Sequence, residues 1–164
     1  MLSSLYLYLL LQLLAVTFID IRSRKISNLW PLANLSVAIL LYAFLQEQYP
    51  LTFRALVFPL GFILIGFPLF LLKIMGAGDS KYLASLFLLL PVTLHESFFE
   101  GLVISTVFIG AVLLTMKVAT DFRRIGADLR ARQWGELRKK LASRFSYAPV
   151  ILIAWVLLGI KLWK

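Results

Sequence analysis

The chain has 164 residues, of which 61% are hydrophobic, whereas about half of the residues of a soluble domain are apolar. It has no cysteine and one histidine, which excludes disulfides, thiolate catalysis and metal sites built from cysteine or several histidines. The length leaves room for one domain, residues 1–164.

Six segments approach the roughly 20 apolar residues that an α-helix needs to cross the bilayer core. In chain order they are 2–19, 29–46, 54–73, 80–95, 98–117 and 146–163. No Lys or Arg precedes the first apolar run, unlike a cleaved signal peptide, so we expect this helix to be retained. The fourth segment is the shortest and contains Pro91. We predict an all-α polytopic membrane protein with six transmembrane helices.

Basic residues gather in alternate loops. The first, third and fifth loops hold 14 of the 17 Lys and Arg residues, and the other side has only Arg54, Lys161 and Lys164. Positively charged loops stay in the cytoplasm. We therefore expect both termini to face away from the cytoplasm and Asp79, in the third loop, to face it.

The long fifth loop carries apolar residues near helical spacing between basic ones. This pattern predicts a cytoplasmic interfacial amphipathic helix over 118–145, broken near Gly135, that binds anionic lipid headgroups. The net charge of +9 could otherwise suggest nucleic acid, but a basic loop tethered to a membrane does not favour that partner. Asp121 and Asp128 lie among its arginines and are interpreted as solvated charges.

The segment Leu94–Glu100 is predicted to be a loop between two helices on the outer side. It contains His95, Glu96 and Glu100 but lacks a further strong ligand, so we assign no metal site.

Two other aspartates lie at the ends of apolar segments. Asp20 ends the first run, and Asp79 follows Gly76-Ala77-Gly78 at the start of the fourth. A carboxylate at membrane depth costs about 2.5–3.5 kcal/mol at the centre and less near the interface. Asp79 could cap the fourth helix and Asp20 could pair with Arg22 or Arg24, so each alone has a structural explanation.

The predicted topology brings Asp20 and Asp79 to one membrane face, which favours a joint function. Two carboxyl groups in close contact share a proton, because both cannot ionise easily. The ionised group can activate water, and the protonated one can bind a carbonyl and protonate a leaving amine. That is aspartyl protease chemistry, which requires no metal or cofactor. Glycines beside Asp79 would let a peptide backbone come close.

Three motifs resemble those of the type IV prepilin leader peptidases. "GAGDSK" (76–81) is similar to the family's GxGD motif, "DIRSRKISN" (20–28) to its first aspartate motif, and "SYAPVI" (146–151) to the Pro-Tyr-Ala-Pro segment that opens its last helix. Ser27 and Ser146 stand where the family usually has proline. We expect these serines to change the rigidity of helix entry and to leave the chemistry intact.

The resemblance implies an enzyme with Asp20 and Asp79 as the catalytic pair, and Gly76, Gly78, Lys81 and Asn28 as supporting residues. It implies a prepilin or pseudopilin substrate, cleaved at the cytoplasmic face of the bacterial inner membrane. Longer members carry cysteine pairs in an insert and also methylate the new pilin N-terminus. This chain has no cysteine, so it resembles the short form that serves Flp-type pili in tight-adherence systems.

Three alternatives stay open. Presenilin-like and signal-peptide-peptidase enzymes also use a GxGD aspartate, but they are larger. A small transporter could use Asp20 and Asp79 as a proton or cation relay, and it would need polar residues deeper in the spans. A structural assembly protein would be unaffected by Asp79→Asn.

Overall fold

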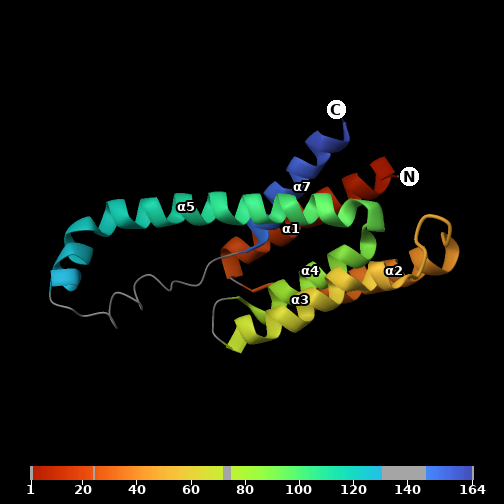
Figure 1. The fold of residues 1–164 in the computed structure, drawn as a ribbon, viewed down its shortest axis with the longest axis horizontal. Coiled ribbons are helices and arrows are strands. Elements are labelled where there is room, and N and C mark those ends of the chain that lie inside the picture. Colours follow the sequence, from red (N-terminus) through yellow and green to blue (C-terminus); the bar gives the residue numbers. More distant parts are fainter. Residues whose placement is uncertain (1, 24, 72–74, 131–146, 164) are drawn as a thin grey trace.

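A computed structural model of the chain describes residues 2–23, 25–71, 75–130 and 147–163, which form six helices and no strand. The helices are α1 (Leu2–Ser23), α2 (Leu29–Phe44), α3 (Phe53–Leu71), α4 (Ala77–Leu89), α5 (Val92–Arg130) and α7 (Ala148–Leu162) (Figure 1). The prediction of an all-α fold is confirmed.

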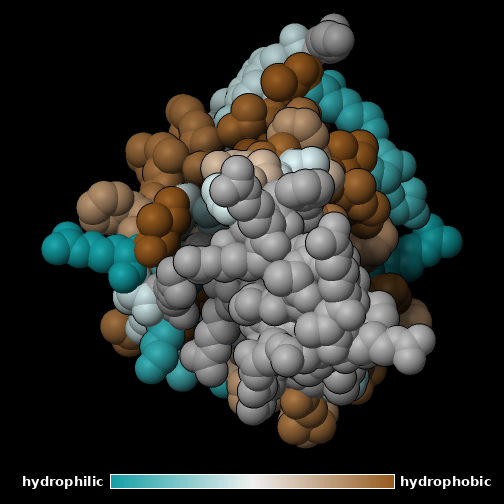
Figure 2. Space-filling model, turned by 90° about the vertical axis from the view of Figure 1, so that its left-hand side faces the viewer, coloured by the Kyte–Doolittle hydropathy of each residue, from teal (hydrophilic) through white to brown (hydrophobic). Residues whose placement is uncertain are grey.

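Within the described residues, three segments are long and apolar enough to cross a membrane: Ser3–Ser23, Phe53–Leu71 and Val92–Met116. The helices α2 and α7 are also apolar but shorter. Many large apolar side chains on these helices reach the surface, as Figure 2 shows around much of the outline of the molecule. Lipid, unlike water, accepts such a surface without cost, so the chain is a polytopic membrane protein.

The helices pack as two groups of three. In one, α7 lies between α1 and α5; in the other, α4 lies between α2 and α3 (Figure 1). We call them the α1–α5–α7 unit and the α2–α3–α4 unit. The helix α4 has 13 residues, so it is about 20 Å long, and nine of them are buried. It is therefore an internal helix, shorter than the span that we expected at 80–95.

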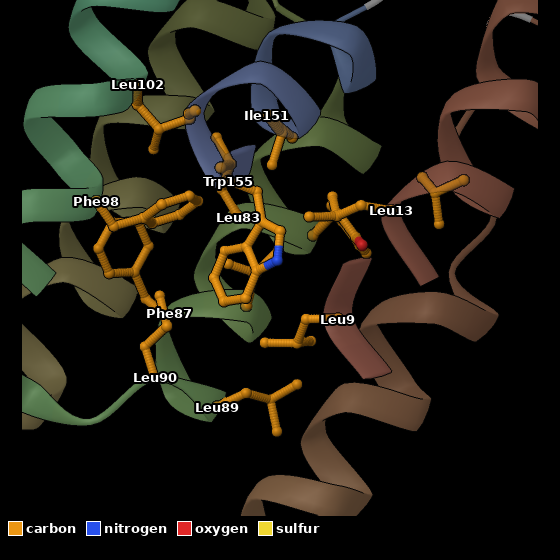
Figure 3. Packing of buried hydrophobic residues seen from close by; sticks show 14 of the residues in the cluster. Leu9, Leu13, Leu83, Phe87, Leu89, Leu90, Phe98, Leu102, Ile151 and Trp155 are labelled. Carbon is orange, nitrogen blue, oxygen red and sulfur yellow. The ribbon is translucent and has the colours of Figure 1, made fainter. Parts of the chain in front are cut away.

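One hydrophobic core joins the two units. Trp155 of α7 lies at its centre, and its indole N–H donates to the Tyr6 carbonyl over 3.3 Å. Around it pack buried side chains from α1, α4 and α5, namely Leu9, Leu13, Leu83, Phe87, Phe98 and Leu102 (Figure 3).

The boundary between the fourth and fifth helices differs from the prediction. We placed it near residues 95–98, but α4 ends at Leu89 and α5 begins at Val92. Pro91 explains the difference, because proline lacks an N–H and disfavours helical geometry in the residue before it. The segment Leu94–Glu100, predicted as a loop, is therefore part of α5.

The helix α5 continues beyond the predicted end at 117 as far as Arg130. Its 39 residues give a length of about 58 Å, roughly twice the bilayer core, and it extends past the other helices in Figure 1. Residues 118–130 therefore continue α5 and do not form a separate helix. The rest of the predicted interfacial helix, including Gly135, and the side chains of Asp121 and Asp128 lie outside the described residues.

Candidate active site

The structure brings Asp20 and Asp79 to the same end of the bundle. Asp20 lies in the last turn of α1 and Asp79 in the first turn of α4, and the two helices run in opposite directions (Figure 1). Both side chains are buried, with 3% of Asp20 and 8% of Asp79 exposed. We call this region the aspartate end; both chain termini lie at the other end.

Asp79 caps the start of its own helix. Its Oδ2 accepts a hydrogen bond from the Gly76 N–H over 3.1 Å, and its N–H donates to the Gly76 carbonyl over 3.1 Å. A Cβ on Gly76 would lie 2.9 Å from that same Oδ2, so a side chain there would displace the oxygen that forms the cap. The predicted capping role is therefore present. It uses one carboxylate oxygen, because Oδ1 has no hydrogen-bond partner within the described part of the chain.

Asp20 is held by the start of the last helix. Its Oδ2 accepts the backbone N–H of Ala148, the first residue of α7, over 3.2 Å. Ala148 is fully buried. The first N–H groups of a helix have no acceptor within the helix, and the Asp20 carboxyl supplies one for α7.

Gly78 brings the two aspartate motifs into contact. A Cβ on Gly78 would lie 2.8 Å from the carbonyl oxygen of Ile26, which belongs to the segment after α1. Ile26 is itself buried. Only a residue without a side chain lets α4 begin so close to this segment. The segment that follows Asp20 and the one that precedes Asp79 therefore touch.

The two carboxyl groups also interact electrostatically. Asp79 lies outside the segments that are long and apolar enough to cross a membrane. Burial raises its pKa to about 6, the hydrogen bond from Gly76 lowers it, and the charge of Asp20 raises it. A raised pKa in one member of a carboxyl pair allows the pair to hold a proton near neutral pH.

Tyr147 and Thr106 complete this end of the molecule, and the sequence did not identify them as site residues. Their hydroxyl oxygens lie 2.9 Å apart, and the Thr106 hydroxyl donates to the Leu102 carbonyl over 2.6 Å. The Tyr147 hydroxyl is therefore the donor to Thr106. Tyr147 directly precedes Ala148, whose amide binds Asp20. Burial raises the pKa of the Tyr147 hydroxyl, the hydrogen bond with Thr106 lowers it, and the charge of Asp79 raises it. Because 41 residues separate Tyr147 from Thr106, no local pattern could reveal the pair.

Asn28 and Lys81, named as supporting residues from the resemblance, are exposed at the same end. Neither side chain forms a hydrogen bond or ion pair within the described ranges, and Asn28 precedes α2 without a side-chain cap. Their supporting role stays a prediction. Among the described residues there is also no group of three or more side chains able to hold a metal ion.

A model of the type IV leader peptidase family matches residues 7–119. This range contains both aspartates and both glycines of the site. No curated protein and no solved structure matches the chain.

Proposed function

We propose, because the chain belongs to the type IV leader peptidase family, that it is an aspartyl endopeptidase that removes the leader of Flp-type prepilins. One observation carries the proposal: Asp20 and Asp79, far apart in sequence, are both buried at one end of the bundle, where they interact. A buried, interacting carboxyl pair in a family of peptidases is suited to aspartyl protease chemistry.

In the proposed reaction the two carboxyl groups share one proton. The ionised carboxylate removes a proton from water as the water oxygen attacks the scissile carbonyl carbon, and the protonated carboxyl donates a hydrogen bond to the carbonyl oxygen. As the tetrahedral intermediate collapses, the C–N bond breaks and the leaving amine takes a proton from the pair.

The proposed substrate is a prepilin or pseudopilin with a short hydrophilic leader before an apolar helix. Only residues 24–28 connect α1 to α2, and the chain has no cysteine. It thus lacks the insert with cysteine pairs found in the longer family members that also methylate, so we propose cleavage without N-methylation.

We propose that cleavage takes place at the cytoplasmic face of the bacterial inner membrane, with both termini in the periplasm. The excess of Lys and Arg in the loops at the aspartate end supports this orientation. Anionic lipid headgroups are the proposed partners of the basic 118–145 segment.

The arrangement of buried polar residues favours a peptidase over a transporter. A relay would need polar groups along a path through the membrane. Gln12, Asn34 and Ser85 are such groups, but they are hydrogen-bonded to one another.

The proposal is tested by co-expression with a Flp-type prepilin and measurement of the pilin mass. We expect membranes with the wild-type chain to remove the leader, and Asp20→Ala and Asp79→Ala each to abolish the mass shift. Asp121→Ala and Asp128→Ala are matched controls that keep full cleavage. Cleavage by either of the first two variants would remove that aspartate from the mechanism.

EDTA distinguishes this mechanism from metal-assisted hydrolysis. Because the carboxyl pair itself activates water, we expect cleavage to continue at the same rate when chelator is in excess over divalent ions. Inhibition that zinc or magnesium reverses would contradict the proposed chemistry.

A further inference from the structure

The two aspartates belong to different units of the fold. Asp20 is on α1, which packs along α7, and Asp79 is on α4, which packs between α2 and α3. The shared core joins the two units mainly through side chains, since among the described helices their backbones approach most closely between α3 and α5, and these two helices diverge toward the aspartate end in Figure 1. The distance between the carboxyl groups therefore depends on how the two units are placed against each other.

At the end opposite the aspartates, aromatic rings hold the units together. Phe58 of α3 packs against His95 and Phe99 of α5, with ring centroids 5.5 and 5.4 Å apart. The short turn through Leu90 and Pro91 also links α4 to α5 there. The hydrophobic effect that holds this cluster together is non-directional, so it specifies the register of the helices less sharply than buried hydrogen bonds do.

Between this cluster and the aspartates, one polar side chain joins the two units. Gln12 of α1 donates through Nε2 to the Asn34 Oδ1 of α2 over 2.5 Å, and the Tyr82 hydroxyl of α4 donates to the Gln12 Oε1 over 3.3 Å. Among the side-chain hydrogen bonds that the structure describes, these are the ones that connect a helix of one unit to a helix of the other.

The partners of Gln12 are themselves fixed. The Asn34 Nδ2 donates to the Ser85 hydroxyl over 3.1 Å, and that hydroxyl donates to the Tyr82 carbonyl over 2.8 Å. All four side chains are buried. Sliding α1 against α4 would leave buried amide and hydroxyl groups unpaired, which is unfavourable for each group.

This network lies close to both aspartates along the chain. Gln12 precedes Asp20 by eight residues on α1, about 12 Å, and Tyr82 follows Asp79 by three residues on α4, about 4.5 Å. A helix transmits a shift at one turn to the next. A displacement at Gln12 therefore reaches Asp20 almost undiminished.

We propose that Gln12, held by Asn34 and Tyr82, is the positioning residue that sets Asp20 against Asp79. The inference rests on the proposed peptidase function, in which the two carboxyl groups must share a proton. The hydrogen bonds of Gln12 connect the two units away from the reacting atoms. They determine whether Asp20 and Asp79 come close enough to share the proton.

Enzyme kinetics give the first test, with purified enzyme and a prepilin substrate. Gln12→Met removes both hydrogen bonds of the bridge and Tyr82→Phe removes one of them, each with little change in side-chain volume. We expect kcat to fall by about 10- to 100-fold with KM unchanged, and more in Gln12→Met than in Tyr82→Phe. Tyr49→Phe is the matched control: Tyr49 is as buried as Tyr82, but its hydroxyl donates to the Leu89 carbonyl within the α2–α3–α4 unit. We expect Tyr49→Phe to keep the wild-type kcat.

A distance measurement gives the second test and needs no activity. Because the chain is free of cysteine, spin labels can be attached to Arg22→Cys and Lys81→Cys, two exposed positions beside Asp20 and Asp79. We expect one narrow distance distribution in the otherwise wild-type chain and in Tyr49→Phe, and a broader or shifted one in Gln12→Met.

The outcomes separate the two proposals. An unchanged distance distribution in Gln12→Met, or equal broadening in Tyr49→Phe, would overturn the positioning role. If the wild-type chain does not cleave prepilin, the peptidase proposal fails. The spin-label distances would then still show whether Gln12 sets the register of the two units.

Discussion

Gly78 lies where α4 meets the segment after Asp20, and its missing side chain allows that contact. Gly78→Ala places a methyl group 2.8 Å from the Ile26 carbonyl, so the segment or the start of α4 must move. A misplacement of about 1 Å can cost 100-fold in rate, and we expect a loss of that order in prepilin cleavage.

The control for Gly78→Ala is Gly61→Ala on α3. A Cβ there would meet no atom within 4 Å, so we expect wild-type cleavage from this variant. Both variants are compared by the rate of the pilin mass shift at equal amounts of enzyme in the membrane. Equal rates would show that the Ile26 segment adapts to a side chain without disturbing the aspartates.

The raised pKa of Asp79 predicts a pH dependence. Because this pKa lies near 6, above the ordinary value of 3.8, the pair keeps its proton up to about pH 6 and loses it as the pH rises further. A fully ionised pair has no proton for the substrate carbonyl or the leaving amine. We expect kcat/KM, measured in detergent, to fall above about pH 6 by roughly tenfold per pH unit. A rate that rises through that range would contradict the shared proton.

Among the helices, α7 contributes to the site through contacts at its start that no local sequence pattern predicts. Its N-terminal amide binds Asp20, and Tyr147 ties it to α5 through Thr106. If this tie positions the amide, Tyr147→Phe and Thr106→Val should each lower kcat by up to about tenfold, the worth of one hydrogen bond. The double variant should be no slower than either single one, because both remove the same interaction.

Thr115→Val is the control for Thr106→Val on the same helix. The Thr115 hydroxyl is exposed and bonds only to carbonyls of its own helix, those of Ala111 and Val112. We expect Thr115→Val to cleave prepilin at the wild-type rate. Additive losses from Tyr147→Phe and Thr106→Val would show that the two hydroxyls act separately.

The helices differ in how well the sequence predicts them. The predicted segments 29–46 and 54–73 agree closely with α2 and α3, since a long apolar run marks a helix directly. The predicted end of the fourth helix was wrong, because hydropathy placed it at the polar residues His95 and Glu96. Instead, the backbone chemistry of Pro91 decides it, and His95 is buried between Phe58 and Phe87.

The site residues also divide into those that a local sequence pattern marks and those that only the folded structure brings together. Asp20 and Asp79 could be found from sequence, because an acidic residue at the end of an apolar run is unusual and needs no partner to be noticed. The bridge from Gln12 to Asn34 and Tyr82 could not, because its members are 22 and 70 residues apart. Each looks like an ordinary polar residue in an apolar helix, and only the packing of the helices reveals the network.

On the scale of the whole molecule, the orientation in the membrane decides which compartment the aspartates face. Arg22 lies at the aspartate end, and Glu47 lies in the connection between α2 and α3 near the other end; both are exposed. Because the loops of the aspartate end carry most of the Lys and Arg residues, they should stay in the cytoplasm.

Single cysteines in this cysteine-free chain test the orientation with a membrane-impermeant maleimide. We expect Arg22→Cys to be labelled in inverted inner-membrane vesicles and protected in right-side-out ones, and Glu47→Cys to show the opposite pattern. A prepilin leader begins in the cytoplasm, so a reversed pattern would put the carboxyl pair on the side without substrate. Such a result would contradict leader cleavage even if both aspartates proved essential for some other reaction.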